Sequence, residues 1–346
     1  MKLFLCLKNV KILSLDNDMR LVNSNERNIC IDIMKGFGII FVILGHMTSL
    51  LPPLVINAIF SFHMPLFFIV GGYLFRQNDN LSGQAQKDFK RLVFPYIFTC
   101  AVIVFLSFLK SIYIGSLNPF LHSIIASVYC SGSIHHSFLF STMPSIGAIW
   151  FLIAMFWCKT IYNMIICKCN NPKMLIVLFS IIALLIDRYL VNLPFALLPG
   201  CSAMIFYLIG DSLKGIRQCS YSPYLIMVCL LSSCISIRYS HLYMVQCYYE
   251  LYPVDILGAC GGTFLVFKVS KFFSKTKFSG VLSWIGRGSL CILCFHLLEL
   301  NFHLCEHLNI PSMWVVQFVV KILFSIFMTL ICYRLSFTRQ IFGLKI

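Results

Sequence analysis

The sequence predicts an all-α fold, a single polytopic helical bundle that crosses a membrane about ten times with both termini on the cytoplasmic side. Hydrophobic residues make up 59% of the 346 positions and charged residues only 11%, with a mean hydropathy of +0.87. A soluble globular surface does not have this composition. Apolar runs of about 20 residues, enough to span the hydrocarbon core as helices, also recur along the chain.

Ten such runs follow one another along the chain. We expect helices near 29–50, 57–75, 92–113, 146–166, 174–191, 196–214, 222–239, 253–272, 283–303 and 312–333. The stretch 121–142 is amphipathic and rich in Ser and His. We expect an external loop there, with room for a half-buried helix.

Basic residues fix the expected orientation, because Lys and Arg concentrate in cytoplasmic loops. With the N-terminus inside, the loops on the outer side hold only Arg188 and Arg238. We therefore expect a cytoplasmic tail at 1–28, one membrane domain at 29–336 and a second cytoplasmic tail at 337–346. The net charge of +15 then reflects orientation and attraction to anionic lipid or phosphate, and a nucleic-acid partner is not expected.

The 17 cysteines do not indicate a disulfide scaffold, because most of them lie inside predicted helices, where Cys acts as a small apolar residue. No zinc-ribbon pattern, which needs two CxxC pairs, is present. Cys130, Cys247 and Cys305 lie in or near outer loops, and a disulfide between two of them stays open.

The first predicted helix carries three ionisable residues, Asp32, Lys35 and His46. Such groups are costly at membrane depth and are functional candidates by default. Asp32 and Lys35 are one turn apart and can pair, whereas His46 lies eleven residues and about 16 Å further up nearly the same face. One stripe is expected to face the bundle: Asp32, Lys35, Ile39, Val42, His46 and Ser49.

Two kinds of polar residue are expected at opposite ends of the bundle. His46, His63 and His296 fall at similar depths in the outer third, and Glu299 lies one turn beyond His296. Histidine suits general-base chemistry because its pKa is ordinarily near neutrality. At the cytoplasmic entrance of the third helix we find a basic cluster, Lys87, Lys90 and Arg91. The arrangement suggests anion binding inside and proton transfer outside.

Five blocks, in order, resemble the signatures of the membrane acyltransferase family 3, particularly its fucose 4-O-acetylase-like and capsular polysaccharide O-acetyltransferase members. They read ICIDIMKGFGIIFVILGH, SFHMPLFFIVGGYLFR, KDFKRLVFPYIF, AIWFLIAMF and SLCILCFHLL. Family members place a basic residue eleven positions before a required histidine. Lys35 and His46 match that spacing, with Lys in place of the more frequent Arg.

The resemblance implies a multi-pass plasma (inner) membrane O-acetyltransferase. It would move an acetyl group from cytoplasmic acetyl-CoA, with no tightly bound cofactor and no metal, to a carbohydrate acceptor. The basic cluster would hold the donor's phosphates, and the rise of about 16 Å to His46 resembles the length of an extended pantetheine arm. We expect His46 as general base, His63 to orient it or stabilise the oxyanion, and Asp32 to fix Lys35.

Substrate contacts are expected from His296, Glu299 and Trp150, and acceptor selectivity from the outer loops 114–145, 239–252 and 304–311. An acetyl-histidine intermediate stays open as an alternative to direct transfer. Two other classes of protein remain as alternatives. One is a transporter or flippase, whose pointers would be broken helices and half-repeats, and neither is evident in the sequence. The other is a metal-dependent enzyme using His303, Glu306 and His307.

Overall fold

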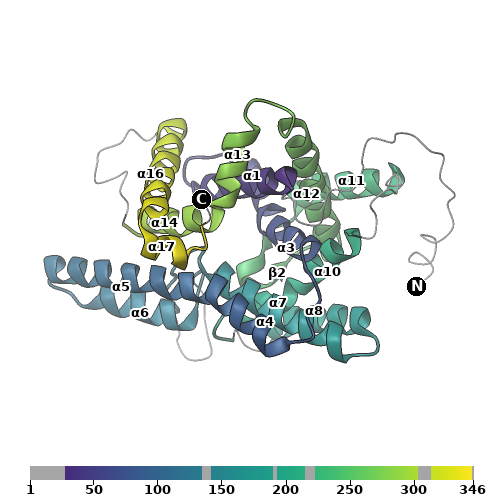
Figure 1. Ribbon diagram of the computed structural model, residues 1–346, viewed down its shortest axis with the longest axis horizontal. Helices are drawn as coiled ribbons and strands as arrows, with labels where there is room; N and C mark the ends of the chain where they lie inside the picture. Colours follow the sequence, from purple (N-terminus) through teal and green to yellow (C-terminus); the bar gives the residue numbers. More distant parts are fainter. Residues whose placement is uncertain (1–27, 135–141, 190–192, 215–222, 303–312, 345–346) are drawn as a thin grey trace.

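A computed structural model describes residues 28–134, 142–189, 193–214, 223–302 and 313–344. Nearly all of its regular structure is helical (Figure 1). In chain order the elements are α1 (Ile29–Gly45), α2 (Pro53–Phe60), α3 (His63–Tyr73), α4 (Leu81–Asp88), η3 (Phe89–Val93), α5 (Phe94–Ile114), α6 (Asn118–Tyr129), α7 (Trp150–Lys168), α8 (Pro172–Tyr189), α9 (Leu197–Ser202), α10 (Met204–Leu213), α11 (Pro223–Tyr239), β1 (Leu242–Tyr243), η4 (Met244–Gln246), β2 (Tyr248–Tyr249), α12 (Val254–Phe273), α13 (Ser279–Arg287), α14 (Ser289–Phe302), α16 (Trp314–Arg334) and α17 (Ser336–Ile341).

Each of the ten apolar runs forms a helix or a pair of consecutive helices, but a count of ten membrane spans is not confirmed. Among the described residues, five helical stretches are long and apolar enough to cross a membrane: 53–73, 81–114, 150–168, 254–273 and 314–334. The bent pair α13 and α14 would make a sixth. The chain is thus an all-α protein with several membrane-capable helices.

Broken helices are present, contrary to the expectation from sequence. The axes of α13 and α14 meet at 71° across Gly288, and glycine is a poor helix former. The apolar run around residue 60 also divides, since α2 ends at Phe60 and α3 begins at His63. Both breaks lie inside hydrophobic sequence, so hydropathy alone does not reveal them.

Two helix pairs approach so closely that only glycine fits between them. A Cβ atom on Gly286 of α13 would lie 1.7 Å from the backbone oxygen of Asp32 in α1. A Cβ atom on Gly210 of α10 would lie 1.9 Å from the backbone oxygen of Ile69 in α3. Small residues at crossings are how helices pack in membranes, where lipid supplies no hydrophobic drive between them. These contacts hold α1 and α3 in the bundle.

The stretch 121–142, expected as an external loop with room for a half-buried helix, begins within a regular helix, α6, that packs along α5. The hydroxyl of Ser123 donates to that of Ser107 at 2.7 Å, and the hydroxyl of Tyr96 donates to the Ser127 carbonyl at 2.6 Å. The pair extends to one side of the bundle (Figure 1). Its serines bond to the neighbouring helix, which lets a polar sequence form a packed helix.

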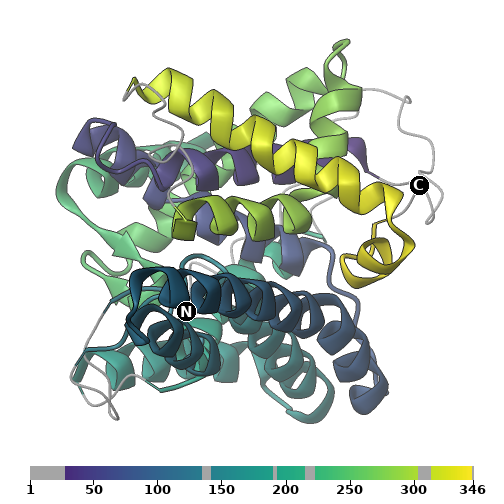
Figure 2. The same ribbon diagram turned by 90° about the vertical axis from the view of Figure 1, so that its left-hand side faces the viewer.

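The described C-terminal residues of the segment expected as a tail at 337–346 also pack against the bundle. α17 follows α16 after Leu335, and Ile341, Phe342 and Leu344 are buried. The ring of Phe342 lies 5.9 Å from that of Phe98 in α5, centroid to centroid. In Figure 2 the yellow α17 lies at the opposite edge of the bundle from the small green sheet.

Large apolar side chains cover the outside of the bundle, as a lipid-facing surface requires. On α16 these include Val319, Leu323 and Phe327, which are 47%, 59% and 60% exposed. The polar residues Ser325 and Thr329 of the same helix are fully buried. This inversion of the soluble pattern supports a multi-pass membrane protein.

Candidate active site

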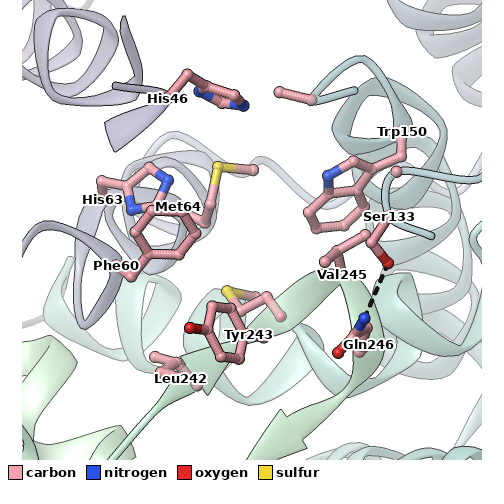
Figure 3. Close-up of a pocket in the computed structure, with 13 residues that line it drawn as sticks. His46, Phe60, His63, Met64, Ser133, Trp150, Leu242, Tyr243, Val245 and Gln246 are labelled. Carbon is pink, nitrogen blue, oxygen red and sulfur yellow. Dashed lines mark hydrogen bonds between the residues drawn. The ribbon is translucent and has the colours of Figure 1, made fainter. Parts of the chain in front are cut away.

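A cavity of about 320 Å³ lies at the end of the bundle where α1 stops and α7 starts (Figure 3). Four parts of the chain build it: the end of α1, the α2–α3 junction, residues 132–133 with 148–150, and the two-stranded hairpin. The residues that line it are His46, Phe60, His63, Met64, Gly132, Ser133, Ala148, Trp150, Leu242, Tyr243, Met244, Val245 and Gln246. Two of the predicted histidines therefore share one cavity with the predicted tryptophan.

His46 is the residue at which α1 ends, and its conformation follows from that position. The helix stops at Gly45 rather than near residue 50, so Ser49 lies in a turn and is exposed, contrary to the predicted stripe. The His46 Nδ1 atom lies 2.7 Å from the Val42 carbonyl oxygen. Because that oxygen can only accept, Nδ1 carries the hydrogen. In the neutral ring Nε2 is then the atom with a free lone pair, as a general base needs.

His63 is held in the same way at the start of α3. Its Nδ1 atom donates to the Ile59 carbonyl oxygen at 2.8 Å, which again leaves Nε2 available. Its ring meets that of Phe60 nearly edge on, with centroids 5.0 Å apart. The break between α2 and α3 puts the Ile59 carbonyl within reach. His46 and His63, on neighbouring helices, thus both have their Nε2 atom available.

His296 lies behind His46 and is not among the residues that line the cavity. The two rings are in contact, with centroids 5.3 Å apart, and His296 is fully buried. Neither of its ring nitrogens has a hydrogen-bond partner among the described residues. The structure therefore brings His296 to His46, as its predicted depth suggested, but in a second layer.

Glu299 forms an ion pair inside the bundle with a residue that the sequence analysis missed. The Lys321 Nζ atom of α16 lies 2.7 Å from Oε1 and 2.6 Å from Oε2 of Glu299. Both side chains are buried, at 1% exposure for Glu299 and 12% for Lys321. A single lysine within the apolar run 312–333 was the available signal, because a charge at that depth needs a partner.

The wall opposite the histidines is aromatic and polar (Figure 3). Trp150 is the first residue of α7, and its indole packs so closely on Gly132 that a Cβ atom there would lie 2.0 Å from Trp150 Cδ1. Gln246 of the hairpin donates through Nε2 to the Ser133 hydroxyl at 3.2 Å. Ser133 and Gln246 come from the predicted outer loops 114–145 and 239–252. The third such loop, 304–311, lies outside the described residues.

The two-stranded hairpin is fixed to the bundle at both its face and its base. Tyr243 of β1 contacts Phe60 of α2, with ring centroids 5.6 Å apart. At the base, the backbone N–H of His241 and its Nδ1 atom both lie 2.9 Å from Glu250 Oε2. These hydrogen bonds from His241 hold the pKa of the Glu250 carboxyl below its usual value. The hairpin therefore forms a stable side of the cavity.

The predicted pair Asp32 and Lys35 is present near the start of α1. Lys35 Nζ lies 3.8 Å from Asp32 Oδ1, and Asp32 is buried. Ile39 and Val42, further along the predicted stripe, are buried as well. Eleven residues of helix separate Lys35 from His46, or about 16 Å, and Lys35 does not line the cavity.

The basic cluster lies on α4 and the π-helical turn η3 that leads into α5. Lys87, Lys90 and Arg91 are all exposed, whereas Asp88 between them is buried and paired with Lys159 of α7. π-Helical turns often occur at functional sites. The cluster precedes α5, whereas the cavity lies where α1 ends. None of the three basic residues lines the cavity.

The metal site and the disulfide considered from the sequence gain no support from the residues that the structure describes. No group of three or more His, Cys, Asp or Glu side chains there could hold a metal ion. His303, Glu306 and His307 lie outside the described residues, as does Cys305. Cys130 and Cys247 are free thiols.

Comparison with known proteins assigns the sequence to a family. The profile of acyltransferase family 3, described as "Acyltransferase domain", matches residues 28–334. The chain is also similar to the nodulation protein NolL of Sinorhizobium fredii (strain NBRC 101917 / NGR234), with 36% identity over 93 residues. That match covers 23% of this chain and 25% of the relative, so it spans only a quarter of the relative's length. No solved structure matches the chain. Because the family profile covers nearly the whole membrane domain, the chain belongs to acyltransferase family 3.

Proposed function

We propose that this membrane acyltransferase moves an acetyl group from cytoplasmic acetyl-CoA to a hydroxyl of a cell-surface or lipid-linked sugar, with His46 as general base. The observation that carries the proposal is the orientation of His46. Its Nδ1 atom is engaged by the Val42 carbonyl, so Nε2 is the nitrogen available to a substrate in the cavity.

The reaction needs a base, a positioned donor and a group that stabilises the oxyanion. His46 Nε2 takes the proton of the sugar hydroxyl as its oxygen attacks the thioester carbonyl carbon. The tetrahedral intermediate collapses with cleavage of the C–S bond, and the imidazolium returns its proton to the departing thiolate. A new ester and free CoA result. His63 lines the same cavity and would orient His46 or hold the oxyanion, while a transient acetyl-histidine stays a variant of the same scheme.

The donor would be held at the other end of the bundle. Lys87, Lys90 and Arg91 are exposed cations beside a π-helical turn and suit the phosphates of CoA. Lys35, paired with Asp32, lies eleven residues before His46 on α1. The proposal requires a passage between helices for the pantetheine arm, and it places the chain in the plasma (inner) membrane with its termini in the cytoplasm.

The test is transfer of label from [acetyl-¹⁴C]acetyl-CoA to glycans in membranes that contain the full chain. We expect His46→Ala to abolish incorporation while the protein remains inserted and folded. His122→Ala is the matched control, because His122 is an exposed histidine of α6 away from the cavity. Full activity of His46→Ala, or loss of activity in both variants, would overturn the assignment.

A transporter or flippase remains the second candidate, favoured by one observation. The bent pair α13 and α14 has the form of a broken membrane helix, which transporters use at their binding sites. The family match favours covalent transfer. The two functions separate in sealed vesicles loaded with a labelled lipid-linked sugar, because a flippase moves the sugar unchanged whereas the enzyme leaves it acetylated.

A further inference from the structure

The cavity has two unlike walls that face each other. His46 and His63 lie on one side, and Trp150, Ser133 and Gln246 lie on the other (Figure 3). A substrate that fills the space would touch both walls at once. Its reacting hydroxyl would meet the histidines while another part of it meets the opposite wall.

The size of the cavity limits what can fill it. Its volume of about 320 Å³ is at the small end of the range for ligand pockets, about 300–1,000 Å³. That space is large enough for one hexose ring.

The chemistry of the walls favours an uncharged ring. Phe60, Trp150 and Tyr243 offer aromatic faces, on which the C–H faces of a sugar ring pack well. Among the described residues that line the cavity, none is Lys, Arg, Asp or Glu. A carboxylate brought into such a site would lose its hydration without gaining an ionic partner, which is costly.

One polar pair stands out on the wall opposite the histidines. Gln246 Nε2 donates to Ser133 Oγ at 3.2 Å, which fixes the direction of the Gln246 amide. Its amide oxygen can accept a hydrogen bond, and a sugar hydroxyl is the complementary donor. Both groups are held in place, because the Ser131 hydroxyl donates to the Ser133 carbonyl at 2.8 Å and the hairpin pairs Tyr243 with Tyr248.

We propose that the cavity binds its acceptor as one uncharged sugar ring, with the Gln246–Ser133 pair selecting which ring hydroxyl faces His46. The inference rests on the proposed function, since it names the acceptor of the same site. Gln246 and Ser133 are specificity-determining residues here. His46 takes the proton, and the pair decides from which hydroxyl.

The experiment uses the full chain in detergent with acetyl-CoA and a panel of p-nitrophenyl hexosides, including a glucuronide as the charged member. NMR of the products gives the position of each acetyl ester. We expect the wild type to form mainly one ester of a neutral hexoside. Gln246→Leu and Ser133→Ala should each raise KM for the sugar about three- to tenfold, the effect of losing one hydrogen bond, and should give mixed esters. Ser133→Thr keeps the hydroxyl and should restore the single ester.

Tyr248→Phe is the matched control, because Tyr248 is an exposed residue of the same hairpin outside the cavity. Unchanged ester positions and KM in both Gln246→Leu and Ser133→Ala would overturn the role of the pair. Equal use of the glucuronide would overturn the preference for an uncharged ring. If the wild type acetylates none of these single rings but labels membrane glycans, the inference fails and the proposed function stands. Absence of any acetyl transfer would remove both.

Discussion

His46 and His296 meet nearly edge to face, with ring centroids 5.3 Å apart and ring planes at 71°. The contact joins the end of α1 to the middle of α14, two segments 250 residues apart in sequence. On its other side His46 is bonded to Val42. The imidazole that we propose as the base is therefore held both by its own helix and by the ring of a neighbouring one.

Replacing His296 tests whether this ring contact positions His46. We expect His296→Ala to lower kcat about two- to tenfold, since an edge-to-face contact contributes about 0.5–1.5 kcal/mol, with little change in KM for either substrate. His296→Phe keeps an aromatic ring and should retain most of the activity. Steady-state kinetics on purified protein measures both. Loss of activity in His296→Phe as well would show that the unpartnered nitrogens, rather than the ring contact, are needed.

Removing one charge of the Glu299–Lys321 pair should destabilise the protein more than removing both. Lys321→Met leaves a buried carboxylate alone, and Glu299→Gln leaves a buried ammonium alone, so each should cost about 3–5 kcal/mol of stability. The double variant removes both charges and should recover most of that loss. Thermal unfolding in detergent gives the comparison. Additive losses in the double variant would mean that the two charges do not depend on each other.

Gly286 should not tolerate even a methyl group. In Gly286→Ala the new Cβ atom would overlap the Asp32 carbonyl oxygen, 1.7 Å away in the present geometry, so α13 must move from α1 at a cost of about 1–3 kcal/mol. Gly280→Ala is the control on the same helix, because a Cβ atom there meets nothing within 4 Å. That change should be neutral or stabilise slightly. Equal melting temperatures for the two variants would contradict the close crossing.

Removing the charges of the basic cluster should change the KM for acetyl-CoA and not the KM for the sugar. Changing Lys87, Lys90 and Arg91 together to Gln should raise the KM for acetyl-CoA about threefold to about a hundredfold, at roughly 0.2–1 kcal/mol for each exposed charge. The effect should shrink as salt is added. Lys173→Gln, a basic residue at the start of α8, serves as control. A donor KM that stays at the wild-type value would leave the cluster as an orientation signal alone.

Acid should loosen the hairpin that closes the cavity. The hydrogen bonds from His241 lower the pKa of Glu250 in the folded protein. The carboxylate therefore stabilises the folded hairpin above the ordinary Glu pKa of about 4.3, and this contribution is lost as the pH falls through the lowered folded-state value. The protection factors of residues 241–250, which compare each exchange rate with the intrinsic rate at the same pH, should fall in that acidic range. Glu250→Gln should show low protection at every pH. Protection factors in the wild type that do not change with acid would contradict the role of the His241–Glu250 hydrogen bonds.

The ion pair and the buried face of the first helix could be predicted from the sequence, because both depend on helical spacing alone. Asp32 pairs with Lys35, and Ile39 and Val42 face the bundle, as a period of 3.6 residues requires. The end of the helix at Gly45 did not follow, because the apolar run continues to residue 51. The turn after it, together with the bond from His46 to Val42, depends on where the neighbouring segments lie.

Contacts between distant segments were beyond the reach of periodicity. Lys321 could be recognised as unusual, but its partner Glu299 depends on which helices are neighbours. The same holds for Gln246 and Ser133, which are 113 positions apart. Their loops were expected to contribute selectivity, yet a sequence does not show that a two-residue strand pair would bring one side chain to the other. The half-buried helix for which the sequence left room at 121–142 is α6, but its hydrogen bond from Ser123 to Ser107 of α5 did not follow from the sequence.

The separation of the two cavity walls along the chain has an evolutionary consequence. The two histidines that line the cavity come from residues before 75, whereas the facing surface comes from residues 132–133, 148–150 and 242–246. Under the proposed function, mutations in those later segments would remodel the surroundings of the acceptor without changing the proposed base. Grafting those segments together from one family member to another would then be a direct route to enzymes with a different acceptor.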